Sequence, residues 1–197
     1  MEAVNWSGAT TRATALALQD GVLVKSGATS RRYLGTGRTY DVSGRAADSS
    51  ARRFLWNMYN RQPRVLLANQ TTGSWTYNGV LRAANSNTTP GLGTVAFVVG
   101  QDQMLNVEYR SLCDGSASSN GYLGIGMDNT SDIATSRHQP SGASQRSYLF
   151  AGYFGAASAG YHYFQALEAT TGGAVNVTFY GTGAGGPFST ITGNIQN

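Results

Sequence analysis

The sequence predicts a single all-β domain, a β-sandwich or jelly roll with one short α-helix near residues 47–60. A chain of 197 residues is long enough to bury one sizeable core without a metal or a disulfide. Charged residues make up only 12%, about half the usual share, and there are 26 glycines. A helical protein would need more charged residues than this to cover the outer faces of its helices. The polar surface must therefore come from residues typical of turns and strand faces.

Strand-like segments recur along the chain with turn residues between them. Residues 95–99 are apolar at every position, which is typical of a strand buried on both faces. Residues 105–110 alternate with period two and indicate a strand with one solvent-facing side. Asn78–Gly79 suits a type I′ turn between two such segments. Further strands are expected within residues 22–24, 33–40, 65–67, 122–127, 147–154, 161–167 and 175–180.

Residues 46–60 depart from this alternation and predict the helix. Its apolar residues recur at helical spacing, Asp48 or Ser49 is available as an N-cap, and Pro63 ends any helix before it. The residues expected on its buried face are Ala47, Ala51, Phe54 or Leu55, and Met58. We expect this helix to pack across or beside a sheet.

The pattern of charged residues limits the kinds of partner that the chain can bind. The net charge is +4, but Lys25 is the only lysine and the arginines are scattered, so we expect no nucleic acid as a partner. Arginine with almost no lysine suits contacts between proteins, because the guanidinium tolerates burial in an interface. Neither a signal peptide nor an apolar run of about 20 residues is present, so no membrane insertion is expected. We expect a protein made in the cytosol that stays soluble or leaves the cell by lysis or another unsignalled route.

Residue types that carry catalysis or bind metals are sparse. Cys113 is the only cysteine and is interpreted as a small buried hydrophobe. His138 and His162 are not closely spaced, and the loop 128–132 is interpreted as an Asx-turn in preference to a calcium site. Glu108 and Glu168 are the plausible carboxylate pair of a glycosidase. We expect no cofactor, no metal and no enzymatic activity.

Tyrosine and tryptophan are abundant for so few charges. Both offer rigid, amphipathic contact area and are enriched at interfaces and sugar-binding surfaces. For Trp75 and Tyr77, which share a face beside the expected turn, a core position and an exposed binding position both remain open. The candidates for a ligand site or an interface are Trp75, Tyr77, Trp6, Arg31, Arg32, Tyr161 and His162.

Several stretches, in order along most of the chain, resemble the C-terminal domains of virion proteins from tailed bacteriophages and prophages. They are DGVLVKSGAT from Asp20, RYLGT from Arg32, RRFLWNMYNR from Arg52, SWTY from Ser74, GIGMD from Gly124 and GYHY from Gly160. The resemblance implies a virion component, a fibre head, an appendage or a capsid decoration, with a jelly-roll-like head and a homotrimeric state. It implies partners among the capsid or tail proteins, assembly in the host cytoplasm, and a role in adhesion or stabilisation. Residues 1–20 are expected to form an attachment or interface segment.

Two other functions remain open at this stage. A carbohydrate-binding, lectin-like domain is the first, with a host-surface glycan as its partner. A polysaccharide-degrading glycosidase is the second.

Overall fold

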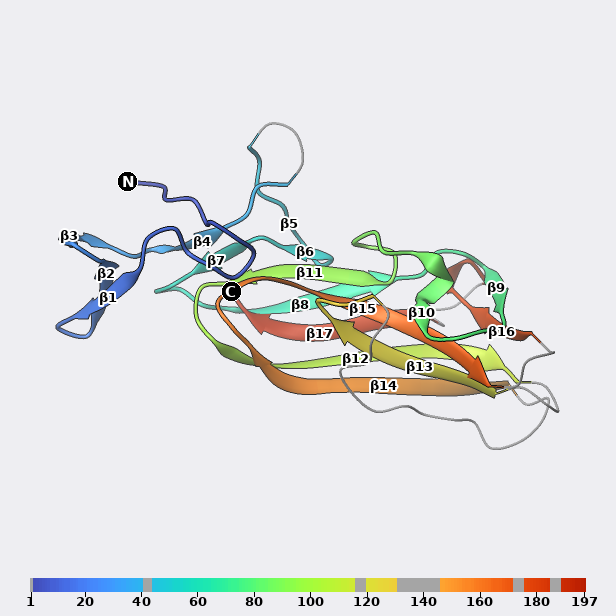
Figure 1. Ribbon diagram of the computed structural model, residues 1–197. Helices are drawn as coiled ribbons and strands as arrows, with labels where there is room; N and C mark the ends of the chain where they lie inside the picture. The colour runs from blue at the N-terminus through green and yellow to red at the C-terminus, as the bar shows by residue number, and fades with distance from the viewer. Residues whose placement is uncertain (1, 41–43, 116–119, 131–145, 172–175, 185–188) are drawn as a thin grey trace.

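The structure, a computed structural model, describes residues 2–40, 44–115, 120–130, 146–171, 176–184 and 189–197. In this part of the chain the regular structure is β-strand, with two short 3₁₀ turns at Ala84–Ser86 and Thr182–Ala184. Two large sheets face each other as a sandwich, which confirms the expected all-β, jelly-roll-like fold (Figure 1). A small sheet made by the N-terminal strands lies at one end of the sandwich (Figure 1).

The first large sheet is built around one long strand, β15, whose neighbours are β13 on one side and β11 and β10 on the other. Strand β11 continues the sheet through a parallel pairing with β6, which pairs in turn with β5. The bounds are β5 (Asp48–Ser49), β6 (Arg52–Arg53), β10 (Arg82–Ala83), β11 (Thr94–Val99), β13 (Asn120–Met127) and β15 (Gly160–Thr171).

The second large sheet is built around β12, which pairs with β14 on one side and with β17 and β16 on the other. Strand β17 then pairs with β8, and β16 with β9. The bounds are β8 (Pro63–Asn69), β9 (Ser74–Tyr77), β12 (Gln103–Asp114), β14 (Arg146–Ala157), β16 (Val177–Tyr180) and β17 (Ser189–Gln196).

The core lies between these sheets and follows the sequence pattern. Every residue of β11 is buried, as its unbroken apolar run predicts. In β12, Leu105, Val107 and Tyr109 point into the core, and the residues between them face outward. Stacked rings fill the space, with the ring centroids of Phe97 and Phe164 5.5 Å apart. Burial of such side chains, each worth about 1.5–3 kcal/mol, is what holds the two sheets together.

The prediction of a helix near residues 47–60 is wrong. This segment forms β5, β6 and β7 (Leu55–Asn57), and β7 pairs with β4 (Gly35–Gly37). Phe54 and Trp56 are buried and Leu55 is 50% exposed, which is the period of two of a strand. The apolar residues at helical spacing concealed it. Pairing with β11 and β4 supplies the backbone hydrogen bonds that a helix makes internally.

The prediction of a hairpin at Asn78–Gly79 is also wrong. The strands on either side, β9 and β10, belong to different sheets, because β9 pairs with β16 and β10 pairs with β15. Asn78–Gly79 therefore lies in a crossover between the two layers of the sandwich.

The N-terminal sheet consists of β1 (Leu16–Gln19), β2 (Val22–Lys25) and β3 (Ala28–Arg32), joined by tight turns. At the first turn Asp20 and Gly21 both have positive φ, and at the second Gly27 does, so these turns need residues that tolerate the left-handed region. The chain then runs through β4 into the sandwich. This sheet and the segment before it form one side of the groove described next.

Candidate binding groove at the N-terminal end

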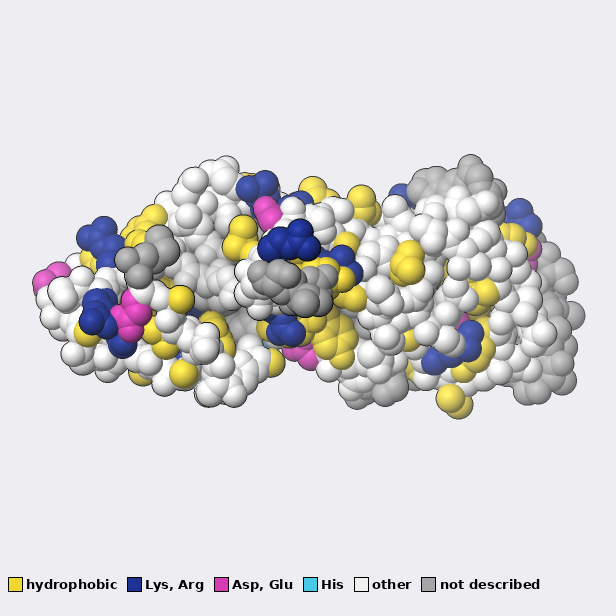
Figure 2. All heavy atoms as spheres, turned by 90° about the horizontal axis from the view of Figure 1, so that it is seen from above, with side chains coloured by type: hydrophobic (Ala, Val, Ile, Leu, Met, Phe, Trp, Pro, Cys, Tyr) yellow, Lys and Arg dark blue, Asp and Glu magenta, His cyan; other side chains and the backbone are white. Residues whose placement is uncertain are grey.

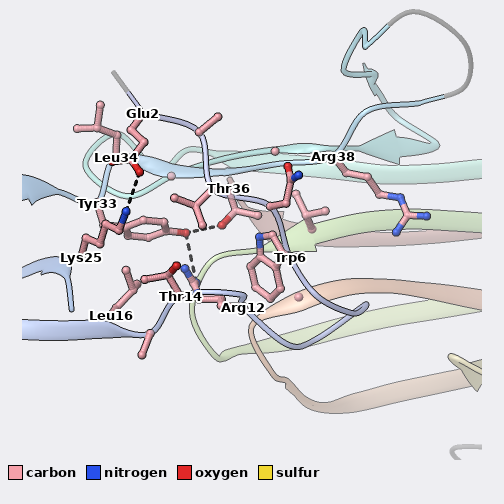
Figure 3. Close-up of a pocket in the computed structure, with 18 of the residues that line it drawn as sticks. Glu2, Trp6, Arg12, Thr14, Leu16, Lys25, Tyr33, Leu34, Thr36 and Arg38 are labelled. Carbon is pink, nitrogen blue, oxygen red and sulfur yellow. Dashed lines mark hydrogen bonds and ion pairs between the residues drawn. The ribbon is translucent and has the colours of Figure 1, made fainter. Parts of the chain in front are cut away.

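A groove of about 1380 Å³ lies between the N-terminal sheet, the segment that precedes it and the start of β15 (Figure 3). Residues 2–16 and 30–39 supply most of its lining, and Val98, Gly160 and Tyr161 close it from the sandwich. Segments distant in the sequence thus meet here. Of the seven candidate residues, the structure brings four into this groove: Trp6, Arg31, Arg32 and Tyr161.

Arg12 holds the N-terminal segment in place. A turn at Ser7–Gly8 folds the chain back, so that Trp6 pairs with Arg12. The Arg12 guanidinium lies between two rings, 4.7 Å from the centroid of Trp6 and 4.7 Å from that of Tyr33. It also donates a hydrogen bond to the carbonyl oxygen of Gly100. Each cation–π contact contributes about 0.5–2 kcal/mol, so this stack fixes the segment against the sandwich.

Glu2 lines the groove and binds two cations, Lys25, as Figure 3 shows, and Arg31. The Lys25 Nζ lies 2.6 Å from Glu2 Oε1, and Arg31 binds the other carboxylate oxygen. Hydrogen bonding from Lys25, together with the charge of Arg31, holds the pKa of Glu2 below its ordinary value. Lys25 and Arg31 come from β2 and β3, so the sheet positions both cations toward one carboxylate.

Two further arginines of the groove stack on tyrosines. The Arg38 guanidinium lies 3.6 Å from the ring centroid of Tyr161, and that of Arg32 lies 5.6 Å from the ring of Tyr59. Sequence reasoning singled out Arg32 and Tyr161 but missed Arg12, Tyr33 and Arg38. Their signal is weak, because each is a lone arginine or tyrosine until the fold places its ring or guanidinium partner beside it.

The structure places Trp75 and Tyr77 away from the groove. Trp75 is 9% exposed, stacks on Phe179 at 5.9 Å and belongs to the core. Tyr77 lies under Arg82, whose guanidinium is 3.5 Å from the ring centroid. Of the two positions that the sequence left open for Trp75, the structure has the buried one.

Trp75 takes part in a buried polar cluster around Glu168, a residue with no solvent exposure. The indole Nε1 donates to one carboxylate oxygen at 2.6 Å, and Arg82 and the Asn85 backbone N–H donate to the other. Burial raises the pKa of Glu168 above its ordinary value, although these three donors work in the opposite direction. The cluster joins β9, β10 and β15, and therefore ties the two sheets together.

Glu108 and Glu168 do not come together as a catalytic pair. Glu108 is exposed on the outer face of β12, and Glu168 is fully buried on β15 of the other sheet. Two carboxylates that flank a glycosidic bond must both reach the substrate. The geometry of this pair does not provide that.

His162 is nearly buried and lies beside Phe97. Its Nδ1 is 2.7 Å from Asp128 Oδ2 and its Nε2 is 2.8 Å from the carbonyl oxygen of Ser158. Both partners are acceptors, so the two hydrogen bonds exist together only when both ring nitrogens carry protons. Burial opposes the charged ring, but the bonds to Asp128 and Ser158 outweigh it and raise the pKa of His162 above its ordinary value.

The remaining chemical candidates that lie within the described part of the chain give no site. Cys113 is fully buried, and burial raises the pKa of its thiol to about 12, as in an inert structural cysteine. Within the described residues, no three His, Cys, Asp or Glu side chains are grouped to hold a metal. Asp132 and His138 lie outside the described residues. In the part of the chain described, no helix is long and apolar enough to cross a membrane.

The fold and the groove define a jelly-roll-like β-sandwich with a basic, aromatic groove at one end. No family model matches the chain, and no curated protein matches it. Nineteen chains of solved structures match its fold. One is in the structure of infectious bursal disease virus, Gx strain, with 10% sequence identity, a TM-score of 0.39 and coverage of 93% of this chain and 42% of that chain. The chain thus spans less than half the length of this structural match.

Proposed function

We propose that the chain is a homotrimeric structural module of a bacteriophage particle, a fibre head, an appendage or a capsid decoration, with a role in adhesion or stabilisation. The resemblance of its sequence to virion proteins and its jelly-roll-like fold support this setting. The observation that carries the proposal is the N-terminal sheet, which lacks a core of its own.

The three strands of this sheet have 4, 4 and 5 residues. Val24 is the only buried residue of these strands, and Leu18 is 71% exposed. A small sheet is stable on its own only when it has three or more strands with a hydrophobic face, or packs against another element. A second copy of the chain is the partner that a homo-oligomer supplies.

Further apolar side chains lie near this sheet. Leu34, Leu55 and Tyr59 are 49%, 50% and 52% exposed, next to or within β4 and β7. Viewed from above, hydrophobic and basic side chains gather at the end that carries β1–β3 and near the middle of the molecule (Figure 2). Closed rotational symmetry buries one such surface repeatedly, which is how most homo-oligomers assemble.

Size-exclusion chromatography with light scattering tests the self-association. We expect a mass three times the 20.8 kDa of the chain at micromolar concentration. Leu18→Asp should dissociate the trimer, because it places a charge on the surface that the copies share. Val80→Asp, at a residue that is 83% exposed in the crossover between the sheets, is the matched control and should leave the mass unchanged. A monomer for the parent protein contradicts the proposal.

Labelling purified phage particles with an antibody to the chain, followed by electron microscopy, tests the virion setting. Label at one position on the particle supports it and also distinguishes capsid from tail. Particles without label contradict it.

A carbohydrate-binding, lectin-like role is the second candidate. The groove at the N-terminal end favours it, because basic and aromatic side chains line a cavity large enough for several sugar rings. This candidate is developed in the next subsection.

A further inference from the structure

We infer that Lys25 and Arg31 form a carboxylate-binding site occupied by the chain's own Glu2, and that an acidic polysaccharide displaces Glu2 and binds along the groove. This inference rests on the adhesion role proposed above and names the chemical class of the ligand. It begins from the contacts that Glu2 makes in the groove with Lys25 (Figure 3) and Arg31.

Glu2 is a good mimic of an external ligand. Its two carboxylate oxygens are bound by two cations on neighbouring strands, which is the geometry that a free carboxylate meets at a recognition site. Glu2 belongs to an extended segment without regular secondary structure, and its side chain is 42% exposed. Exposed ion pairs are weak and screened by salt, so a competing carboxylate replaces Glu2 at little cost.

The rest of the groove favours a ligand with several negative charges. Arg38 lies on the far side of the groove from Lys25, with Thr14 and Thr36 between them (Figure 3). Among the described residues of the lining, Glu2 is the only carboxylate, against five basic side chains: Arg12, Lys25, Arg31, Arg32 and Arg38. A polymer with a carboxylate on successive units can meet more than one of these cations.

The lining between the cations favours sugars over an acidic peptide. Ser30, Thr14 and Thr36 bring hydroxyl groups to the groove, and Trp6 and Tyr161 bring aromatic rings. Hydroxyl groups exchange hydrogen bonds with sugar hydroxyls, and rings such as these are typical of sugar-binding surfaces. Protein ligands rely more on deep apolar anchors.

Calorimetric titration with oligogalacturonate, a chain of sugars that each carry a carboxylate, tests the inference at low salt. We expect measurable binding of oligogalacturonate and none of the neutral oligosaccharide maltohexaose. A hexamer of glutamate is the third probe and should bind more weakly than oligogalacturonate. Equal binding of the neutral sugar, tighter binding of the glutamate peptide, or no binding of oligogalacturonate overturns the inference.

Glu2→Gln gives the sharpest outcome. If Glu2 is an internal competitor, its removal should tighten binding by about twofold to fivefold, the range that one exposed ion pair spans. If Glu2 only supports the structure, binding should stay unchanged or weaken, and the inference fails. Lys25→Met and Arg31→Met should each weaken binding by about threefold or more, because each removes a cation and keeps a side chain of similar length.

Arg146→Gln is the matched control. Arg146 is also an exposed, ion-paired arginine, but its partner is Asp114 at the end of β12. This variant should bind as the parent does, and a comparable loss contradicts a site at the groove. Light scattering on the same samples separates the two proposals, since binding by a monomer contradicts only the trimer and a trimer without binding contradicts only the inference.

Discussion

Trp75→Phe tests whether Trp75 acts as a structural residue of the interior. The substitution removes the indole Nε1–H that donates to Glu168 Oε2 at 2.6 Å. It keeps an aromatic ring that can stack on Phe179, whose ring lies nearly parallel to that of Trp75 at an angle of 14°. Glu168 retains its bonds from Arg82 and Asn85, so one donor is lost from an otherwise satisfied carboxylate.

The expected cost follows from these contacts. A hydrogen bond to a charged group contributes about 1.5–3 kcal/mol, and Glu168 has no access to water that could replace the lost donor. The smaller ring also leaves a cavity beside Phe179, which adds about 1 kcal/mol. We expect Trp75→Phe to lower the free energy of unfolding by about 2.5–4 kcal/mol, a large share of the stability of an ordinary domain.

Urea denaturation measures this change, and the m-value should stay the same because the fold is retained. Tyr77→Phe is the control, since it removes a hydroxyl that donates to the Val80 carbonyl near the surface and should cost about 0.5–1 kcal/mol. In a Glu168→Gln background, Trp75→Phe should cost less, because the acceptor is neutral. A change below about 0.5 kcal/mol for Trp75→Phe, or a loss of glycan binding at unchanged stability, refutes this reasoning.

Three further outcomes are expected. The pKa of His162 is raised on folding, so its two bonds to Asp128 and Ser158 stabilise the protein fully below about pH 6.5, and one of the two is lost as pH rises through the raised pKa. His162→Asn should flatten the fall in thermal stability between pH 6 and 8, and an unchanged slope contradicts this assignment. Gly100→Ala should lower the free energy of unfolding by about 1–3 kcal/mol, because its methyl group meets the ring of Trp56; a neutral result in urea denaturation refutes it. Phe154→Ser should change stability by less than about 0.5 kcal/mol, because the ring is 74% exposed, and a larger loss shows a contact on that face.

The strands of the core could be predicted because their signal is local. An apolar residue at every position of β11 reports burial on both faces, and the alternation in β12 reports one face toward the core. The structure of residues 47–60 could not be predicted in the same way, because a few apolar residues in so short a segment fit the period of a helix as well as that of a strand. Phe54 and Trp56 are buried only because β11 and β4 lie beside them, which is information about distant parts of the chain.

The groove shows the same limit at the level of a site. Aromatic and basic residue types directed attention to Trp6, Arg31 and Tyr161, and the fold brings these three to one groove. The same reasoning gave equal weight to Trp75, because the local sequence around a tryptophan in a strand does not tell whether the side chain faces solvent or the opposite sheet. What distinguishes them is Glu168, 93 residues further along the chain, which the fold places beside the indole.

The preference for arginine over lysine is explained in part within the chain. In the described residues, seven arginines lie over aromatic rings: Arg12, Arg32, Arg38, Arg52, Arg61, Arg82 and Arg146. A planar guanidinium stacks on a ring and still donates in its own plane, which an ammonium group does not do. Much of a composition that suggested contacts between proteins is therefore used for contacts inside one.

This distinction separates the cations of the groove into two kinds. Arg12 lies between two rings and binds a backbone carbonyl, so replacing it disturbs the segment that forms the groove wall. Lys25 and Arg31 are held by one exposed carboxylate, that of Glu2, and their charges are available to a ligand once that carboxylate leaves. A loss of binding in Arg12 variants would therefore reflect the fold. Opposite changes in Glu2→Gln and Lys25→Met, with binding unchanged in Arg146→Gln, are what competition at this site predicts, because an effect of net charge alone would also weaken binding in Arg146→Gln.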